Sequence, residues 1–390
     1  MSDQLPSKNF GFGEDEEMLR DVARKYLDEN LPVQKLRTLV AEDSDAVYER
    51  GEPTQWDRDQ WKQIIELGWT GLAVPEEAEG IGFKLAGIVG LVEEIGKHAL
   101  PSPLVSTLIS TYVLRATSGE GTNAWLSKIA DGASASLATT DATGSWDAAT
   151  CDVTATAGAD GSVSLTGSAY FVQDAGKADI LVVLARREAS CVLCVVKSDA
   201  PGVNVALNHI HDLTRDQATV HFDNVEVAAP DVVSDNAAAA IESAWPAVLV
   251  TVAADLVGCG EWQLQATVNY AKDRKQFDRQ LGFFQAVKHP LVNAMMEIDR
   301  ARSLVYHAAS CVDEGVDDAL QAARMAKSAA SDAGAFVSDR SVQLHGGIGF
   351  TWESDIHLFF KRSMHNQALY GDGAYQRRKL AEILIGPIAS

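Results

Sequence analysis

The sequence predicts an α+β fold made of a helical N-terminal domain, a middle β-barrel domain and a C-terminal four-helix bundle. The segment up to about residue 129 shows helical hydrophobic patterns and no strand pattern. From about residue 132 the chain is rich in Ser, Thr, Ala and Gly and then in β-type runs, and from Asn236 it returns to long alanine-rich helical patterns. We therefore expect domains at 1–131, 132–235 and 236–390, packed as one unit because no low-complexity linker separates them.

The N-terminal segment places apolar residues at helical spacing. One expected helix face is formed by Leu19, Val22, Tyr26 and Leu27. Residues 61–67 give a second such face. The run Leu100-Pro-Ser-Pro103 is expected to end a helix, because proline lacks a backbone N–H and clashes with the preceding turn.

The middle segment contains three β-type runs, at 180–184, 192–196 and 220–227, and the last of them nearly alternates. Asp160-Gly-Ser stands between two short β-type runs and predicts a hairpin turn. Cys191 and Cys194 lie inside an apolar run, and the five cysteines are scattered. We interpret them as buried thiols rather than as a zinc site or a disulfide framework.

The C-terminal segment shows helical patterns at 237–271, 285–311, 317–344 and 355–366, which together predict the bundle. The third and fourth are joined by the glycines Gly346, Gly347 and Gly349. Such a join is either a tight corner or a place where a ligand approaches the main chain, and the glycines alone leave both open. His345, His357 and His365 are twelve and eight residues apart, which does not suit one metal site.

Charge and hydropathy exclude several classes of protein. The 390 residues include 33 basic and 54 acidic ones, for a net charge of −21, which argues against nucleic acid or an anionic membrane as a partner. An anionic ligand would therefore need a local basic patch. No apolar run reaches the ~18 residues of a membrane span, and the start MSDQLPSKNF lacks a signal-peptide core. We expect a cytoplasmic protein.

Three motifs resemble the acyl-CoA dehydrogenase family. QLHGGIGFTWE, beginning at Gln343, is similar to its C-terminal signature. YAKDRKQF, from Tyr270 to Phe277, followed by LGFFQ, resembles a helix pair of the family, and LGWTGLAVPEEAEG resembles its N-terminal helix-to-loop turn. Their order and spacing fit, and the resemblance covers nearly the whole chain.

The resemblance implies FAD as the cofactor. Arg274, which by itself reads as a solvated helix charge, would bind the FAD pyrophosphate, because arginine can grip a phosphate with two hydrogen bonds. Phe277 would face the adenine side. The family contacts to the cofactor of a neighbouring subunit match Gln285, Gln343, Gly346 and Gly347. The resemblance therefore implies at least a dimer, and a homo- or hetero-tetramer is the usual family assembly.

In the middle domain, LATTDATGS is similar to the family's L-A-x-T-E-P-x-x-G-S. Thr140 would meet the flavin ring, and Ser145 the pyrophosphate or the thioester side, although by themselves these residues read as turn formers. The chain departs from the pattern at Asp141, where the family has Glu. Further on, Phe171 replaces the family tryptophan beside the flavin, and Gln173 replaces the threonine whose hydroxyl faces flavin N5.

The family reaction oxidises an acyl-CoA thioester to its trans-2-enoyl-CoA and passes electrons to electron-transfer flavoprotein or a similar acceptor. A carboxylate removes the α-proton, and the counted family positions for it fall here on Tyr370 and Val248. Asp372, two residues past Tyr370, and Asp255, two turns past Val248, are the candidate bases. The alternatives are that Asp372 caps the last helix or contacts FAD, and that Asp255 is a buried acid paired with Arg or Lys.

Three functions therefore stay open. The first is an FAD-dependent acyl-CoA dehydrogenase with a non-standard base. The second is a base-lacking partner subunit of a heteromeric dehydrogenase, because LVEEIGKHALPSP, HGGIGFTWE and YGD look most like bacterial degradative members, including those acting on steroid side chains. The third is a flavin oxidase of the same fold, with an aspartate as base. No motif predicts which acyl group is bound.

Overall fold

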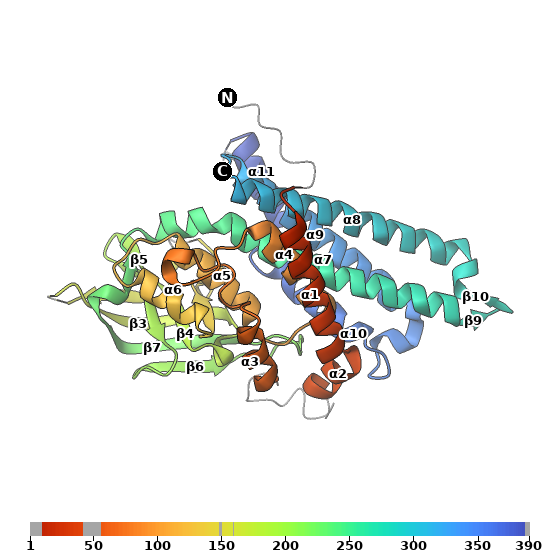
Figure 1. Ribbon diagram of the computed structural model, residues 1–390, viewed down its shortest axis with the longest axis horizontal. Helices are drawn as coiled ribbons and strands as arrows, with labels where there is room; N and C mark the ends of the chain where they lie inside the picture. Colours follow the sequence, from red (N-terminus) through yellow and green to blue (C-terminus); the bar gives the residue numbers. More distant parts are fainter. Residues whose placement is uncertain (1–9, 42–55, 148–149, 159, 387–390) are drawn as a thin grey trace.

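The computed structural model describes residues 10–41, 56–147, 150–158 and 160–386. It has the predicted order of a helical part, a sheet and a set of long helices (Figure 1). The first nine residues, which lack a signal-peptide pattern, lie outside the described residues.

The N-terminal part is helical, as predicted. Its helices are α1 (Glu14–Asn30), α2 (Val33–Ala41), α3 (Arg58–Glu66), α4 (Leu85–His98), α5 (Leu104–Arg115) and α6 (Thr122–Ala130), with a 3-10 turn η2 (Glu76–Ala78). Helix α4 ends before the two prolines, and Leu27 is buried. Val22 is 43% exposed, so its expected place on the buried face of α1 is wrong; Ala23 takes that place. A small side chain at the contact hides such a position from a pattern of large apolar residues.

The middle part is one mixed sheet. Its strands are β1 (Ala135–Ala138), β2 (Thr154–Ala157), β3 (Val163–Gln173), β4 (Ile180–Arg187), β5 (Ser190–Lys197), β6 (Val203–Leu207), β7 (Gln217–Val227) and β8 (Val232–Ser234), with 3-10 turns η4 (Ala175–Lys177) and η5 (Ala229–Asp231). The order is β6-β7-β3-β2-β4-β5-β8, and β1 adds parallel to β4. The predicted hairpin is confirmed as β2–β3.

The predicted barrel is wrong, because within the described residues the sheet is an open path that ends at β6 and β8. Sequence alternation identifies a strand and its buried face, but it does not tell whether the edge strands meet. Helix α5 packs on β1, so the N-terminal domain covers that side of the sheet.

The C-terminal part contains α7 (Ala237–Asp273), α8 (Gln285–Asp313), α9 (Ala319–His345) and α10 (Ile356–Ala368), which are the predicted bundle helices, and a further helix α11 (Gly373–Leu384). Helix α7 is central and packs against α4, α8, α9 and α10. Among the described helices, α7 alone is long and apolar enough to cross a membrane, yet 78% of its most apolar window is buried inside the protein. Its composition is therefore that of a core helix.

A short hairpin not predicted from the sequence follows α7. It consists of β9 (Lys275–Gln276) and β10 (Arg279–Gln280), and the 3-10 turn η6 (Leu281–Phe283) leads from it into α8. A second 3-10 turn, η7 (Gly346–Phe350), joins α9 to the segment before α10. The hairpin lies at one end of the molecule and the eight-stranded sheet at the other (Figure 1).

Candidate functional site

The bundle end holds the first group of predicted cofactor residues. Arg274 directly follows α7, and Phe277 with Asp278 forms the tip of the β9–β10 hairpin. Both tip residues have positive φ, 53° and 58°, although neither is a glycine, and Phe277 is 86% exposed. Positive φ at both central residues is the geometry of a two-residue hairpin turn of type I′, and this turn leaves the Phe277 ring exposed.

The side chains at the hairpin end of the bundle include cations that would suit an anionic ligand. Exposed cations gather on and beside the hairpin at Lys272, Arg274, Lys275 and Arg279, with Asp273 and Asp278 among them. Arg274 makes no ion pair within the part of the chain that the structure describes. A protein of net charge −21 thus has the local basic patch that an anionic ligand requires.

The end of α9 lies against the end of α7. The rings of Tyr270 and His345 stack with centroids 4.3 Å apart, and burial lowers the pKa of His345. A Cβ on Gly349 would lie 2.8 Å from Val342 O, so this glycine is needed for the corner. A Cβ on Gly346 or Gly347 would meet nothing within 4 Å, so packing does not explain these two. Exposed main chain beside open space is what a ligand contact would need.

The second group lies in the middle domain. Thr140 is buried and forms an isolated bridge with Tyr170 of β3. The loop after it is shaped by Asp141, whose Oδ1 accepts hydrogen bonds from Thr143 N at 2.9 Å, Thr143 Oγ1 at 2.8 Å and Ser145 N at 2.9 Å. Burial opposes the charged form of Asp141, but these hydrogen bonds outweigh it and lower its pKa. Ser145, half-buried, is therefore presented by an ordered turn.

Phe171 and Gln173 lie at the end of β3. Phe171 has φ of 54° and is 41% exposed. The buried Gln173 donates from Nε2 to Phe171 O at 3.0 Å, while its Oε1 lies 2.6 Å from His365 Nε2 on α10. A carbonyl cannot donate, so the amide nitrogen faces Phe171, and His365 must be the donor to Oε1. Burial lowers the pKa of His365, which keeps this ring neutral.

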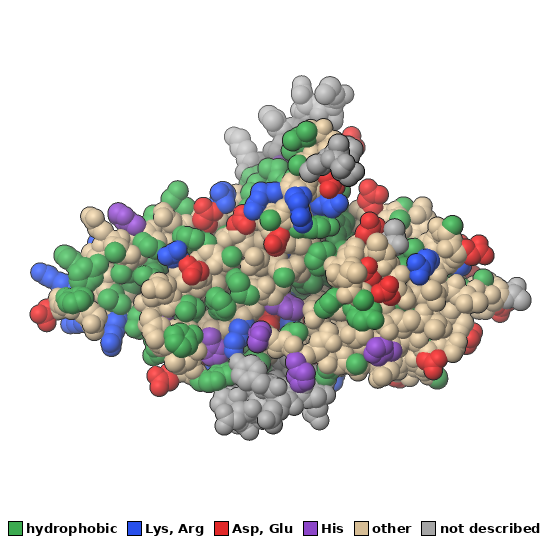
Figure 2. All heavy atoms as spheres, turned by 180° about the vertical axis from the view of Figure 1, so that it is seen from behind, with side chains coloured by type: hydrophobic (Ala, Val, Ile, Leu, Met, Phe, Trp, Pro, Cys, Tyr) green, Lys and Arg blue, Asp and Glu red, His purple; other side chains and the backbone are tan. Residues whose placement is uncertain are grey.

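A cavity of about 680 Å³ lies beside His365, a size typical of ligand sites. It is lined by His209, Ile210, His211, Asp212, Val342, Phe350, His357, Phe360, Lys361, Met364 and His365. In the view from behind, histidine side chains gather near the centre of the face (Figure 2). Asp212 Oδ2 and His357 Nδ1 are buried without a hydrogen-bond partner among the described residues. Burial, Lys361 and Arg37 lower the pKa of His357 to about 4, so it too is neutral.

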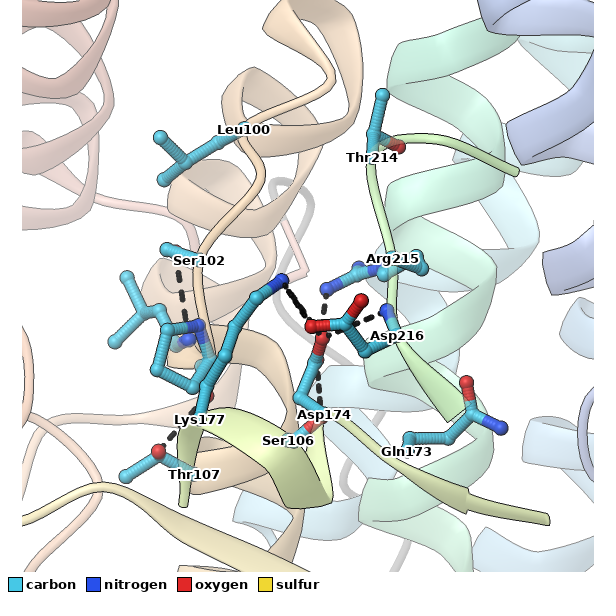
Figure 3. A network of polar contacts seen from close by, with 12 residues as sticks. Leu100, Ser102, Ser106, Thr107, Gln173, Asp174, Lys177, Thr214, Arg215 and Asp216 are labelled. Carbon is cyan, nitrogen blue, oxygen red and sulfur yellow. Dashed lines mark hydrogen bonds and ion pairs between the residues drawn. The ribbon is translucent and has the colours of Figure 1, made fainter. Parts of the chain in front are cut away.

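A buried polar network is centred on Asp174, the residue that follows Gln173 (Figure 3). Asp174 is fully buried, accepts a hydrogen bond from Ser106 of α5 at 2.7 Å and pairs with Lys177 and Arg215, each at 3.5 Å. Lys177 also pairs with Asp216 at 3.0 Å. The network therefore fixes the end of β3 against both the N-terminal domain and the β6–β7 loop.

Asp255 belongs to the same network. Its two oxygens accept from Arg362 Nε at 2.9 Å and Arg362 Nη2 at 2.7 Å, and Arg215 pairs with it as well. Burial would raise its pKa, but the two guanidinium groups outweigh burial and lower it. A carboxylate with a lowered pKa and two arginine partners is a poor proton acceptor. These contacts match the alternative in which Asp255 is a buried structural acid.

Asp372 has the capping role that the sequence left open. Its side chain accepts a hydrogen bond from Tyr375 N at 2.8 Å and begins α11. The two counted base positions hold no carboxylate: Val248 is fully buried, and Tyr370 is 5% exposed. Burial raises the pKa of Tyr370, so its phenol stays protonated. The catalytic role of either aspartate stays a prediction that none of these contacts supports.

Three residues at these sites have no signal in the sequence motifs. His365 is one polar position in a helical pattern, and its partner Gln173 is 192 residues away along the chain. Trp146 and Trp245 both contact the ring of Tyr370, with centroids 6.2 and 5.3 Å away. Only the folded chain brings these side chains together.

Two family models match the chain: acyl-CoA dehydrogenase, N-terminal domain, over residues 13–133, and acyl-CoA dehydrogenase, C-terminal domain, over residues 250–385. A curated relative, acyl-CoA dehydrogenase IpdE2 of Mycobacterium tuberculosis, is 30% identical over 352 residues, covering 90% of this chain and 91% of the relative. FadE12 of the same species is 31% identical over 312 residues, covering 76% and 80%.

Two solved structures are similar over nearly their full length. The Tcur3481-Tcur3483 steroid ACAD is 27% identical with a TM-score of 0.83, covering 96% of this chain and 98% of that one. The ChsE4-ChsE5 complex from Mycobacterium tuberculosis has a TM-score of 0.85 at 24% identity, covering 97% and 100%, which shows a shared fold.

Proposed function

This chain belongs to the acyl-CoA dehydrogenase family, and we propose that it is a subunit of an FAD-dependent enzyme that converts an acyl-CoA thioester to a trans-2-enoyl-CoA. The similar structure that is named as a steroid ACAD supports a steroid-derived acyl group as the substrate class. Electrons would leave to electron-transfer flavoprotein or a similar acceptor.

The observation that supports this proposal is the separation of the two groups of cofactor residues. Arg274 lies about 28 Å along α7 from Asp255, from the rise of 1.5 Å per residue, and Asp255 is where the bundle meets the middle-domain network. Phe171 and Gln173 belong to β3, and Thr140 and Ser145 follow β1. The sheet lies at one end of the molecule and the hairpin at the opposite end (Figure 1). The two groups of one chain thus face different cofactors. Each FAD would lie between the middle domain of one subunit and the bundle end of another.

The residues present fit FAD. The guanidinium of Arg274, which forms no ion pair with the described residues, suits a pyrophosphate, and the open main chain at Gly346 and Gly347 suits close approach of the adenosine half. Gln173 and Thr140 offer polar groups held in fixed positions for the ring. When bound, FAD supplies the acceptor for the hydride that leaves the β-carbon. The chain's own part is to bind, orient and exclude water.

A second candidate, the base-lacking partner subunit of a heteromer, is favoured by the contacts of the two aspartates. Asp255 is engaged by two arginines and Asp372 by a helix N-terminus. Two of the similar structures are named as pairs of different proteins. In this candidate the other subunit contributes the carboxylate, and this chain completes the FAD site.

The first test is the role of Arg274. Arg274→Ala is expected to lower the flavin content of the purified protein at least tenfold, because hydrogen bonds to a charged phosphate contribute about 1.5–3 kcal/mol. Absorbance near the flavin band and circular dichroism would be compared with those of Arg300→Ala, a matched exposed arginine on α8 that pairs with Glu297. Unchanged flavin content in Arg274→Ala would end the proposal.

A further inference from the structure

Tyr370 is packed inside a cluster of aromatic side chains from three parts of the chain. Its ring lies edge-on to Trp245 of α7 at 5.3 Å and to Trp146 of the loop after β1 at 6.2 Å. Trp146 also meets Tyr375 of α11 at 5.8 Å. Trp245 lies three residues before Val248 on α7, so the cluster includes Tyr370, at one counted base position, and shares a helix face with the other.

The turn that carries Tyr370 is held by a buried clamp. Lys327 of α9, which is fully buried, hydrogen-bonds Ser331 Oγ at 2.9 Å, Gln367 O at 2.9 Å and Gly371 O at 3.0 Å. Gln376 Nε2 donates to Tyr370 O at 2.7 Å.

Tyr370 itself has φ of 57°, in the left-handed region that non-glycine residues rarely adopt. The clamp bonds the carbonyls of both Tyr370 and Gly371, and so it keeps a strained turn in place. The ring position is therefore fixed by hydrogen bonds as well as by packing.

A surface groove of about 470 Å³ leads to this cluster. Its lining includes Trp146, Trp245 and Tyr375 of the aromatic cluster. Tyr370 is absent from this lining and is 5% exposed, so it lies behind the wall made by Trp146, Trp245 and Tyr375. Neither counted base position, Tyr370 or Val248, lines the groove.

We propose that Tyr370, clamped between Trp146 and Trp245, is a plug that closes this chain's own thioester pocket. The inference rests on the proposed function and deepens it: the chain would take part in an FAD site but bind no acyl-CoA, so the thioester of the assembly occupies a pocket of another subunit. The plug replaces a carboxylate with a large neutral ring and fills the volume that the reacting carbons would need.

The test is thioester binding by the full chain, measured by isothermal titration calorimetry with butyryl-CoA and octanoyl-CoA. The wild-type chain and Tyr370→Phe, which keeps the ring, are expected to show no saturable binding tighter than a Kd of about 1 mM. Tyr370→Gly removes the ring and suits the positive φ, and it is expected to bind at least tenfold tighter, at one thioester per chain.

Trp245→Ala removes another ring of the same wall, from α7, and is also expected to bind the thioester at least tenfold tighter than wild type. The test therefore does not depend on the folding of one variant. Circular dichroism of each variant checks the fold. Saturable wild-type binding at one per chain would overturn the plug, as would folded Tyr370→Gly and Trp245→Ala variants that bind no tighter than wild type. Flavin content is measured separately and reports on the proposed function. Failure of the plug proposal is therefore distinguishable from failure of the proposed function.

Discussion

Arg362 is a fully buried cation on α10 that joins three domains. Its guanidinium binds Asp255 of α7, donates to Thr214 Oγ1 of the β6–β7 loop at 2.9 Å and reaches Leu100 O of the N-terminal domain at 3.4 Å. Removing one partner of a buried ion pair leaves an uncompensated charge, which costs about 3–5 kcal/mol. The residue therefore contributes to the fit between domains more than to any one of them.

We expect Arg362→Met to lower the free energy of unfolding by roughly 3 kcal/mol or more at pH 7, since the volume is kept and the charge is lost. In the wild type the pKa of Asp255 lies below its usual range, so its contribution to stability is present above pH ~4 and is lost as the pH falls below that. In Arg362→Met the pKa of Asp255 rises. The difference in free energy of unfolding between the variant and the wild type should therefore be smaller at pH 5 than at pH 7.

Denaturant unfolding at pH 7 and at pH 5 measures the free energy of unfolding of Arg362→Met and of the wild type. Arg340→Met replaces a half-buried arginine on α9 that pairs with Asp339; it is the control and should change stability by no more than about 0.5 kcal/mol. A deficit in Arg362→Met as small as that of the control would contradict the assigned role of the network.

At the scale of single residues, the sequence predicts those whose neighbours along the chain form a motif. Motif spacing predicts a cofactor role for Arg274, Gly346 and Gly347, because the residues around them match the family pattern. The partners of Arg362 are far from it in sequence, with Asp255 107 residues away, and periodicity contains no information about such pairs. For Asp255 the sequence predicts burial from its apolar neighbours, but only the fold distinguishes a base from an acid held by two arginines.

Among the elements, long helices and alternating strands were predictable and short elements were not. The strands of the β9–β10 hairpin have two residues each, and its tip residues Phe277 and Asp278 lack the Asn-Gly or Gly-Gly pair that usually marks such a turn. The open sheet was missed because closure depends on the tilt and stagger of all strands together, which no single strand encodes.

The crossing of α4 and α7 depends on glycine at the contact. A Cβ on Gly258 of α7 would lie 1.8 Å from Glu93 O of α4, and a Cβ on Gly96 of α4 would lie 2.2 Å from Asp255 O of α7. We expect Gly258→Ala to separate the helices and to destabilise the protein by about 1–3 kcal/mol or more, because a well-packed contact cannot absorb the added carbon.

Gly260→Ala, two residues further along α7, is the control. Its Cβ would lie 3.5 Å from Ile298 Cγ1, an ordinary contact, and alanine favours helix by about 1 kcal/mol over glycine. Thermal melts should therefore rank Gly260→Ala at or above wild type and Gly258→Ala well below it. Equal melting temperatures for the two variants would show that the crossing tolerates a side chain.

On the scale of the whole molecule, the residues proposed to bind the cofactor lie at both ends of one chain, and the two counted base positions, Tyr370 and Val248, hold no carboxylate. We expect the isolated chain to show no turnover with any acyl-CoA thioester. Activity should appear when it is co-expressed with a family member that has Glu at the position of Tyr370 or Val248. Dye reduction by a panel of thioesters measures turnover, and sedimentation should show that the active, FAD-containing form is an oligomer rather than a monomer.

The aspartate variants decide which chain contributes the base. In the active assembly, Asp372→Asn should leave turnover within about twofold, whereas removal of a positioned general base costs ~10²-fold or more. Asp255→Asn should act through stability, because its loss leaves Arg362 and Arg215 without their shared anion, and the folded fraction should keep its activity. Turnover by the wild-type chain alone, abolished in Asp372→Asn with FAD retained, would place the base in this chain after all. If instead the partner's Glu variant abolishes turnover while flavin content is unchanged, the proton is taken by the partner, and this chain serves the reaction by holding the cofactor.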